Sequence, residues 1–322
     1  MFFATLFDKN YIPRATALID SLKSVSNIDI PEVFILCLDD VVYNYFSDWE
    51  NVHLISLNDI ENKYPELYSS KGNRSFVEYI FTLSPFLPLY ILETYLYVNR
   101  ITSVDSDLLF INDPFEVLNN LGDDKIGITR HGFEKDLLFL EKYGKYNVSF
   151  QSFPNSNKSI MCLKKWAKDC IEYCGDELDD LGRFADQKYL DNWIEEFQNV
   201  VDFPSPTVGL APWNVSGFDR QLKPIFYHFH DFRLKSSYHI TLGLNNYNIT
   251  TPSRDVIKLY AQYWRELKSN NNSIDNKLVR HAGATNNWVF LRDLKHLPIL
   301  IRLLGFHIYV DLKNRKLNFY LF

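Results

Sequence analysis

Short apolar blocks alternate with a longer amphipathic segment near the amino terminus. Residues 2–7 and 33–38 are almost wholly apolar, and residues 53–57 form a third short block. Residues 11–25 lie between the first two blocks and place their apolar side chains at helical spacing. This order predicts an α/β fold with a mainly parallel sheet flanked by helices. In such sheets ligands bind at the carboxyl ends of the strands, so polar residues at those ends matter most.

Two aspartates interrupt the next apolar stretch. Residues 101–104 and 108–111 have strand-like composition, and Asp105, Ser106 and Asp107 lie between them. An unpaired buried carboxylate costs several kcal/mol, so the pair needs a cation or several hydrogen-bond donors. Side chains two apart on a strand point the same way, so both aspartates can face one ion. Oxygen ligands suit Mg²⁺ or Mn²⁺, which usually also hold substrate phosphates.

The segments that follow are also predicted to alternate between helices and strands. Residues 75–94 form a mostly apolar helix in which Pro85 and Pro88 should each bend or break the chain. Residues 147–151 alternate polar and apolar side chains, which predicts a half-buried strand. Asp186 opens a helical segment and is placed to cap it. Further elements are expected as a strand at 125–129, a helix at 159–173, the helix at 184–190, a structured loop at 204–215 and a strand at 225–230.

The chain changes character after residue 240. A polar stretch is followed by a helical pattern at 255–267 and by an asparagine-rich break. Residues 289–304 are apolar and basic, which favours helical structure packed on the main domain or, alternatively, an amphipathic helix on an anionic membrane surface. We therefore expect one domain at 1–240 and a helical extension at 241–322.

Composition narrows the class of protein. The net charge is −6 with no long basic run, which argues against a nucleic-acid partner. The four cysteines match neither a zinc pattern nor a disulfide framework, so reduced thiols in a cytoplasmic protein are the simplest account. No run of about 18 apolar residues predicts a membrane span, which leaves only peripheral contact with the inner face of a membrane. Aromatic residues make up 16% of the chain, which suits either sugar stacking or a core of large side chains.

The chain carries four motifs in a fixed order. They are Asp8–x–x–Tyr11 with a helix ending in Ser21 and Leu22, a long helix before Val104–Asp105–Ser106–Asp107, the pair Asp186 and Gln187, and His228–Phe229 followed by Arg233. This order resembles that of the GT-A glycosyltransferases, and is similar to glycosyltransferase family 8 and to bacterial polysaccharide-type transferases. The resemblance covers residues 2–233. One departure concerns the family's His-x-x-Gly-x-x-Lys arrangement, where Asp231 takes the glycine place and Leu234 the lysine place, with Arg233 and Lys235 on either side.

The resemblance implies a GT-A fold and a nucleotide-sugar donor, with a UDP-sugar expected first. It implies a Mn²⁺ or Mg²⁺ ion held by Asp105, Asp107 and His228, although a core histidine with a satisfied hydrogen bond is the alternative for His228. His230, on the same face of the expected strand, is the reserve ligand. The donor is expected to contact Ala4, Thr5, Phe7, Asp8, Tyr11, Arg74, Ser106 and Arg233. Strand-end capping is the alternative for Asp8, and a solvated side chain is the alternative for Arg74.

The remaining expected contacts concern catalysis and the acceptor. Asp186 would deprotonate the acceptor hydroxyl in an inverting enzyme, whereas Asp186 and Gln187 would orient the sugar in a retaining one. A plain helix cap is the alternative for Asp186. Three residues are expected to contact sugar or acceptor, with packing as the alternative: His131, Trp213 and His230.

The resemblance thus implies sugar transfer to a hydroxyl of a glycan or lipid-linked acceptor, in surface polysaccharide or glycoconjugate synthesis. A nucleotidyltransferase of similar fold is one alternative, but it usually carries a glycine-rich basic loop after the first strand, and residues 7–13 contain no glycine. A catalytically inactive nucleotide-sugar-binding module is the other, and the intact Asp-x-Asp motif argues against it.

Overall fold

The computed structural model describes residues 1–27, 30–203, 208–215, 223–236, 239–271, 306–311 and 316–321. The chain divides into two compact units. The first comprises Met1–Leu210 with Asp219–His228, and the second comprises Ala211–Phe218 with Phe229–Phe322.

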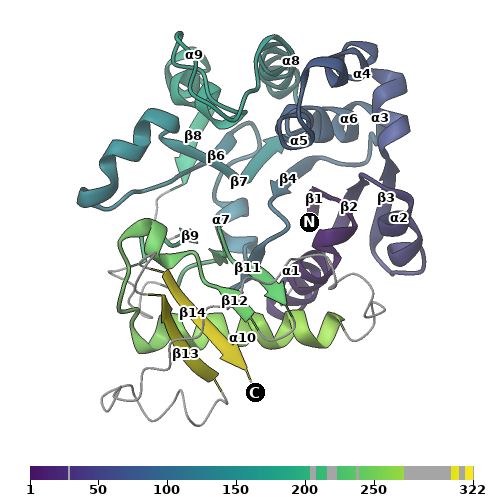
Figure 1. The fold of residues 1–322 in the computed structure, drawn as a ribbon. Helices are drawn as coiled ribbons and strands as arrows, with labels where there is room; N and C mark the ends of the chain where they lie inside the picture. The colour runs from purple at the N-terminus through teal and green to yellow at the C-terminus, as the bar shows by residue number, and fades with distance from the viewer. Residues whose placement is uncertain are drawn as a thin grey trace. The chain divides into compact units, whose positions relative to one another are not determined.

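A seven-stranded sheet forms the centre of the first unit (Figure 1). The first four strands in the order below run parallel to one another, β7 runs antiparallel to both β4 and β6, and β8 is parallel to β6. The mainly parallel sheet expected from the sequence is therefore confirmed. The spatial order is β3 (Val52–Ser56), β2 (Glu32–Cys37), β1 (Phe2–Phe7), β4 (Arg100–Val104), β7 (Tyr146–Pro154), β6 (Ile126–Arg130) and β8 (Val200–Phe203).

Helices cover the sheet because their apolar side chains share its core. Buried residues of three helices, α5 (Phe76–Leu83), α6 (Phe86–Thr94) and α8 (Asn157–Glu172), pack with Ala4 and Phe34 of the strands. The other helices of this unit are α1 (Ile12–Val25), α2 (Asp40–Phe46), α3 (Leu57–Lys63), α4 (Pro65–Ser70), α7 (Phe115–Asn119) and α9 (Trp193–Glu196), with 3₁₀ turns η1 (Lys9–Tyr11), η2 (Lys71–Asn73), η3 (Lys135–Tyr143) and η4 (Gln187–Asn192).

The apolar segment at 75–94 forms two helices, so the predicted break at Pro85 is confirmed. The chain breaks at Ser84 and Pro85, between α5 and α6. Pro88 breaks nothing, because it lies in the first turn of α6, where a missing N–H is tolerated. By length and hydropathy, Phe76–Thr94 is a candidate membrane span, but 56% of it is buried inside the fold. Core packing accounts for its apolar composition.

Strand β7 is more buried than its alternating pattern predicted. It pairs with β4 on one side and β6 on the other, and eight of its nine residues are buried. The expectation of a half-buried strand is wrong, because the polar residues Asn147, Ser149 and Gln151 point into the protein interior instead of solvent. Buried polar side chains need hydrogen-bond partners, so β7 differs from the other strands of the core, which bury mostly apolar side chains.

A small second sheet places the segment after β4 beside the segment around residue 228. Its strands are β5 (Leu108–Phe110), β10 (Phe226–His228) and β9 (Gly209–Leu210), in the order β5-β10-β9. His228 pairs with Leu108 in the antiparallel register of β5 and β10. The Ser21 hydroxyl accepts a hydrogen bond from the Phe110 N–H at 3.0 Å, so α1 also holds β5.

The second unit contains a helix and an antiparallel sheet. Helix α10 (Arg254–Asn271) contains the expected helix at 255–267, and Tyr263 stacks on Phe229 with ring centroids 3.7 Å apart. The sheet was not expected from the sequence, so the extension is not purely helical. Residues 289–304 lie outside the described residues. The sheet order is β11 (Arg233–Ser236), β12 (His239–Thr241), β14 (Lys316–Leu321) and β13 (Phe306–Asp311), and a short turn η6 (Leu244–Tyr247) precedes α10.

Ser75→Ala should lower the stability of the first unit. The Ser75 hydroxyl accepts from the Glu78 N–H at 3.2 Å, and the Glu78 carboxylate accepts from the Ser75 N–H at 2.6 Å. Loss of such a reciprocal cap costs about 1 kcal/mol. Thermal denaturation should show a lower melting temperature than in Ser47→Ala, which removes an exposed hydroxyl elsewhere. Equal melting temperatures of the two variants would contradict this role.

Candidate active site

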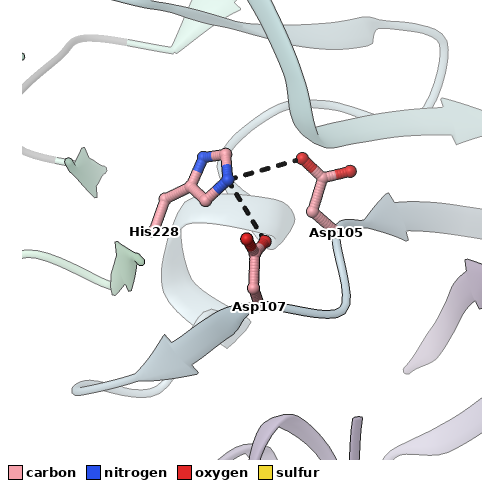
Figure 2. Close-up of side chains that lie close together, drawn as sticks. All are labelled: Asp105, Asp107 and His228. Carbon is pink, nitrogen blue, oxygen red and sulfur yellow. Dashed lines mark ion pairs between the residues drawn. The ribbon is translucent and has the colours of Figure 1, made fainter. Parts of the chain in front are cut away.

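Three side chains that could bind a metal ion converge from two distant parts of the sequence. Asp105 follows β4, Asp107 precedes β5, and His228 ends β10. The Nε2 atom of His228 lies 3.2 Å from Oδ1 of Asp107 and 3.7 Å from Oδ2 of Asp105 (Figure 2). One ligand atom from each residue lies within 4.8 Å of the other two. The group therefore has the spacing that a single divalent ion requires.

Asp105 and Asp107 lie close together because of a turn, and not because they alternate on one strand as the sequence predicted. They do not alternate on a strand, because β4 ends at Val104 and β5 begins at Leu108. A turn joins the two strands, with the Leu108 N–H donating to the Asp105 carbonyl at 3.4 Å. The Asp105 N–H donates to the Ser149 carbonyl at 3.1 Å and fixes the start of this turn. The turn, held by backbone bonds at both ends, orients the carboxylates.

The electrostatics of this group favour a bound cation. Burial raises the pKa of Asp105 to about 6, the His228 imidazole opposes that shift, and the Asp107 carboxylate adds to it. The His228 side chain is only 5% exposed, so its orientation is fixed by the surrounding protein. Two carboxylate oxygens and an imidazole nitrogen fit Mn²⁺ well and Mg²⁺ less well. A divalent ion held there would neutralise the charge of both aspartates.

The end of β1 belongs to the same region. The pKa of Tyr11 is raised by burial and by the negative charges of Asp107, Asp8 and Asp105, while Arg14 lowers it. Tyr11 is therefore within electrostatic range of the aspartate pair. The Asp8 carboxylate accepts hydrogen bonds from the N–H and side-chain amide of Asn10 at 3.0 and 2.8 Å, so it does cap η1.

The other residues expected at the nucleotide are mostly buried. Ala4 and Phe7 are core residues of β1, and Ser106 is 7% exposed within the turn. The Thr5 hydroxyl is buried and has no hydrogen-bond partner among the described residues. Any contact of Ala4 or Phe7 with a nucleotide would therefore use their backbone groups, and this stays a prediction.

Asp186 is a buried residue that precedes η4 and lies beside Trp166 of α8. It stands at the N-terminal position of η4, but its side chain makes no capping hydrogen bond, so the predicted helix cap is wrong. The Trp166 indole N–H donates to the Asp186 carbonyl at 2.9 Å, and Ala185 adopts a left-handed φ of 45° just before it. Burial raises the pKa of Asp186 to about 7, a hydrogen bond from Ser84 lowers it, and the charge of Asp105 raises it. Asp186 therefore lies within electrostatic reach of the metal group.

Gln187 and Arg74 both bind backbone carbonyls. The Gln187 amide donates to the Tyr143 carbonyl at 3.0 Å, which ties η4 to the connection between β6 and β7. The Arg74 guanidinium donates to the carbonyls of Cys170 and Ile171 at 3.0 and 2.9 Å, at the carboxyl end of α8. These bonds give both side chains a structural role. The expected contacts of Gln187 with the sugar and of Arg74 with the donor stay predictions.

His131 is buried and stacks on Phe133 with ring centroids 4.6 Å apart. Its backbone N–H donates to the Lys145 carbonyl at 2.9 Å, which holds the end of β6. Packing of this kind is the alternative that the sequence left open for His131, and a contact with sugar or acceptor stays a prediction.

The residues after His228 follow a different path from the one expected. Strand β10 ends at His228, so the prediction that His228 and His230 share one strand face is wrong. Asp231 stands where the resemblance expects a glycine and adopts a left-handed φ of 60°, a conformation that Asp tolerates better than most residues. Within the second unit, His230 and Trp213 have ring centroids 5.5 Å apart, and Arg233 pairs with Asp231 at 3.1 Å.

Two polar residues of the central sheet were not singled out from the sequence, the half-buried Ser103 on β4 and the buried Gln151 on β7. Both carry a buried polar atom with no hydrogen-bond partner in the described part of the chain. The signal that could have found them is a polar side chain inside a predicted strand.

The comparisons with known proteins support a common family and fold. No family model matches the chain. The uncharacterized protein YfnF of Bacillus subtilis (strain 168) is 30% identical over 254 residues, which cover 73% of this chain and 82% of YfnF. The chain belongs to the YfnF family. The uncharacterized protein YfnD of the same organism is 27% identical over 246 residues, covering 72% of this chain and 78% of YfnD.

A solved structure identifies the fold of this member of the YfnF family. It is the galactosyltransferase LgtC in complex with donor and acceptor sugar analogs, with a TM-score of 0.53 and 14% identity, covering 84% of this chain and 95% of that one. At this identity the likeness concerns the fold alone. The resemblance to GT-A glycosyltransferases that the motif order predicted is thereby confirmed at the level of fold.

Asp186→Asn should stabilise the protein more at high pH than at low pH. The pKa of Asp186 is raised from 3.8 to about 7 in the folded state, so the folded protein keeps a proton that the unfolded chain has lost. Stability therefore falls as pH rises through this window, by at most about 1.4 kcal/mol per pH unit. Melting curves should show a gain over wild type at pH 8 that shrinks towards pH 4, and no such trend in Asp48→Asn, an exposed control. A gain that does not depend on pH would contradict the raised pKa.

Arg74→Gln should lower the melting temperature while leaving UDP binding unchanged. The substitution removes two hydrogen bonds to the end of α8, which is expected to cost about 1–3 kcal/mol. Calorimetry with UDP and Mn²⁺ would measure nucleotide affinity beside the melting curves, and Lys158→Gln is an exposed control. Weaker UDP binding without loss of stability would instead support the phosphate contact.

Proposed function

We propose that this protein is a metal-dependent glycosyltransferase that moves a sugar from a nucleotide-diphosphate sugar, a UDP-sugar in the simplest case, to a hydroxyl of a glycan or lipid-linked acceptor. The observation that carries the proposal is the convergence of Asp105, Asp107 and His228 in a GT-A fold. The motif order expected for nucleotide-sugar transfer and the metal geometry point to the same three residues, although they are independent of one another.

Each part of the site has a role in this reaction. Asp105, Asp107 and His228 would hold a Mn²⁺ or Mg²⁺ ion. When bound, such an ion supplies Lewis-acid stabilisation for the charge that develops on a leaving nucleoside diphosphate. Tyr11 and Asp8 lie at the end of β1, where the base or ribose of the nucleotide would be bound. The turn through Ser106 keeps the two aspartates fixed relative to that nucleotide.

Asp186 is the carboxylate available for the sugar. A pKa of about 7 leaves both its neutral and its ionised form accessible at neutral pH. The ionised form can accept a proton from an acceptor hydroxyl, as inversion requires, and either form can hydrogen-bond the sugar, as retention requires. The proposal assigns Asp186 to the sugar and leaves the stereochemical outcome to experiment.

The cellular setting follows from the sequence and belongs to the proposal. Transfer to a glycan or lipid-linked acceptor would place the enzyme in surface polysaccharide or glycoconjugate synthesis. A cytoplasmic location with peripheral contact through residues 289–304 would bring it to such an acceptor. Cosedimentation of the full chain with anionic vesicles, compared with a variant whose Arg292, Lys295 and Arg302 are replaced by Gln, tests that contact.

Asp105→Asn and Asp107→Asn should abolish sugar transfer without unfolding the protein. Each substitution removes a metal ligand and part of the repulsion between the two carboxylates, so the melting temperature should be equal to or above that of wild type. A thermal-shift screen of nucleotide sugars with Mn²⁺ would identify the donor. Release of UDP from that donor should then fall by at least about 100-fold in each variant.

The matched control for these variants is Asp123→Asn, which changes an exposed aspartate of the same unit. Its UDP release should equal that of wild type. Wild-type turnover in both Asp105→Asn and Asp107→Asn would disprove metal-dependent transfer. Donor binding that depends on Mn²⁺, without transfer or hydrolysis for any acceptor, would favour an inactive binding module.

A further inference from the structure

Three buried polar atoms near the metal group have no partner in the described residues. They are the hydroxyl oxygen of Ser103, the amide nitrogen of Gln151 and Oδ2 of Asp186. Gln151 is 1% exposed and Asp186 is 2% exposed, whereas Ser103 is half-buried with its hydroxyl oxygen inside. An unsatisfied buried polar group typically costs about 1–3 kcal/mol, and native proteins keep few of them. Three together, close to a candidate active site, indicate groups that bind a ligand.

The sheet register places two of these side chains side by side. Ser103 pairs directly with Gln151 across β4 and β7, so their side chains point to the same face of the sheet. Ala4 of β1 pairs with Ser103 on the other side, so the small Ala4 side chain lies on the same face as the hydroxyl. Asp105 lies two residues beyond Ser103 in the chain. The pair therefore lies directly next to the metal-binding turn.

Asp186 belongs to the segment that packs on the face of β7 that carries Gln151. Phe153, two residues after Gln151 on the same face of β7, packs against Trp193 with ring centroids 6.4 Å apart. Trp193 follows η4, which also packs on β7, and Asp186 stands at the start of η4. The charge of Asp105 raises the pKa of Asp186, which is consistent with the two carboxylates lying within electrostatic range of one another. Ser103, Gln151 and Asp186 thus lie between the sheet and its helices, beside the metal group.

The chemistry of the three groups suits hydroxyls and not phosphates. A hydroxyl, a primary amide and a carboxyl group provide donors and acceptors but no positive charge. Sugar hydroxyls donate and accept at once, so each can pair with one of these groups. A diphosphate would need cations or the metal ion, which lie outside this set. The ligand class is therefore a polyhydroxylated ring.

Gln187, the amide that the family resemblance assigned to the sugar, is engaged elsewhere. Its Nε2 atom donates to the Tyr143 carbonyl, and its side chain packs against Gly144, whose φ of 142° brings the backbone close. A Cβ on Gly144 would lie 3.3 Å from Cγ of Gln187, which shows how closely the two are packed. Gln187 is thus bound by the connection between β6 and β7, whereas the Gln151 amide nitrogen is not bound by the described protein.

Resting on the proposed function, we infer that Ser103 and Gln151 form, with Asp186, the subsite for the hydroxyls of the donor sugar, and that Gln151 supplies the amide contact in place of Gln187. Gln151 is then a determinant of sugar specificity, because a site built to hydrogen-bond hydroxyls discriminates strongly against sugars that lack them. Deoxy analogues of the donor sugar should bind and react much less well than the parent sugar.

Gln151→Met tests this inference in the full-length protein with Mn²⁺. The variant keeps the side-chain volume and removes an unsatisfied amide, so its melting temperature should equal or exceed that of wild type. Its kcat/KM for the UDP-hexose that the wild type uses best should fall by about 10- to 100-fold, while the Kd for UDP stays unchanged. Ser103→Ala should show the same selective loss to a smaller extent.

Two further variants complete the experiment. Gln187→Met should lower the melting temperature, because it breaks the bond to Tyr143, and should reduce kcat/KM less than Gln151→Met does. Gln198→Met, at an exposed glutamine, should match wild type in every measurement. A larger loss of kcat/KM in Gln187→Met than in Gln151→Met would overturn the inference, as would equal weakening of UDP and UDP-hexose binding in Gln151→Met.

The design separates failure of this inference from failure of the proposed function. Turnover that is lost in Asp105→Asn but retained in Gln151→Met would overturn the inference alone. If wild type bound and turned over no nucleotide sugar, the proposed function would fail and the inference with it. A donor whose kcat/KM falls in Gln151→Met, and whose deoxy analogues react equally with wild type and variant, would support it.

Discussion

The repulsion between two carboxylates at the end of β4 is the constraint on which the rest of the site depends. Asp105 and Asp107 stand in one turn, and each raises the cost of ionising the other in a partly buried setting. The fold holds them there through the backbone bond from Asp105 to Ser149 and through the pairing of β5 with β10. A cation relieves the repulsion, and His228 adds a ligand without adding negative charge. This arrangement of charges underlies the proposal that a divalent ion binds here and holds a phosphate-bearing donor.

Strand β7 carries buried polar residues beside the turn that contains Asp105 and Asp107. β7 is a central strand, yet Asn147, Ser149 and Gln151 are all buried on it. The carbonyl of Ser149 holds the metal-binding turn, while Gln151 faces the helical layer beside Ser103. One strand therefore both positions the metal ligands and presents polar groups next to them. This joint role is a reason for a polar strand in a place where packing alone would favour apolar residues.

Much of the first unit was predictable because its segments are strongly patterned. The apolar blocks at β1, β2 and β3 and the helical spacing of α1 left little choice of element type, and their order implied a parallel sheet. The pairing of Asp105, Asp107 and His228 was predictable only because motifs of a known fold occur in the right order. The face shared by His228 and His230 and the half-buried β7 were wrong, because both predictions assumed that local alternation continues along a strand or into solvent. The cap at Asp186 was wrong because its side chain is buried and makes no capping hydrogen bond.

The sequence by itself determined the elements of the sheet and the chemistry of the candidate metal-binding side chains, since both depend on local patterns and on residue type. Tertiary structure alone decided which polar groups meet. The register of β4 against β7 brings Ser103 to Gln151, and the antiparallel pairing of β5 and β10 brings residue 228 to residue 108. Such pairings join residues dozens of positions apart, and no periodicity within a segment carries information about the strand beside it. Burial then set the pKa of Asp186, because desolvation depends on what surrounds a carboxylate in space and not on its neighbours in the chain.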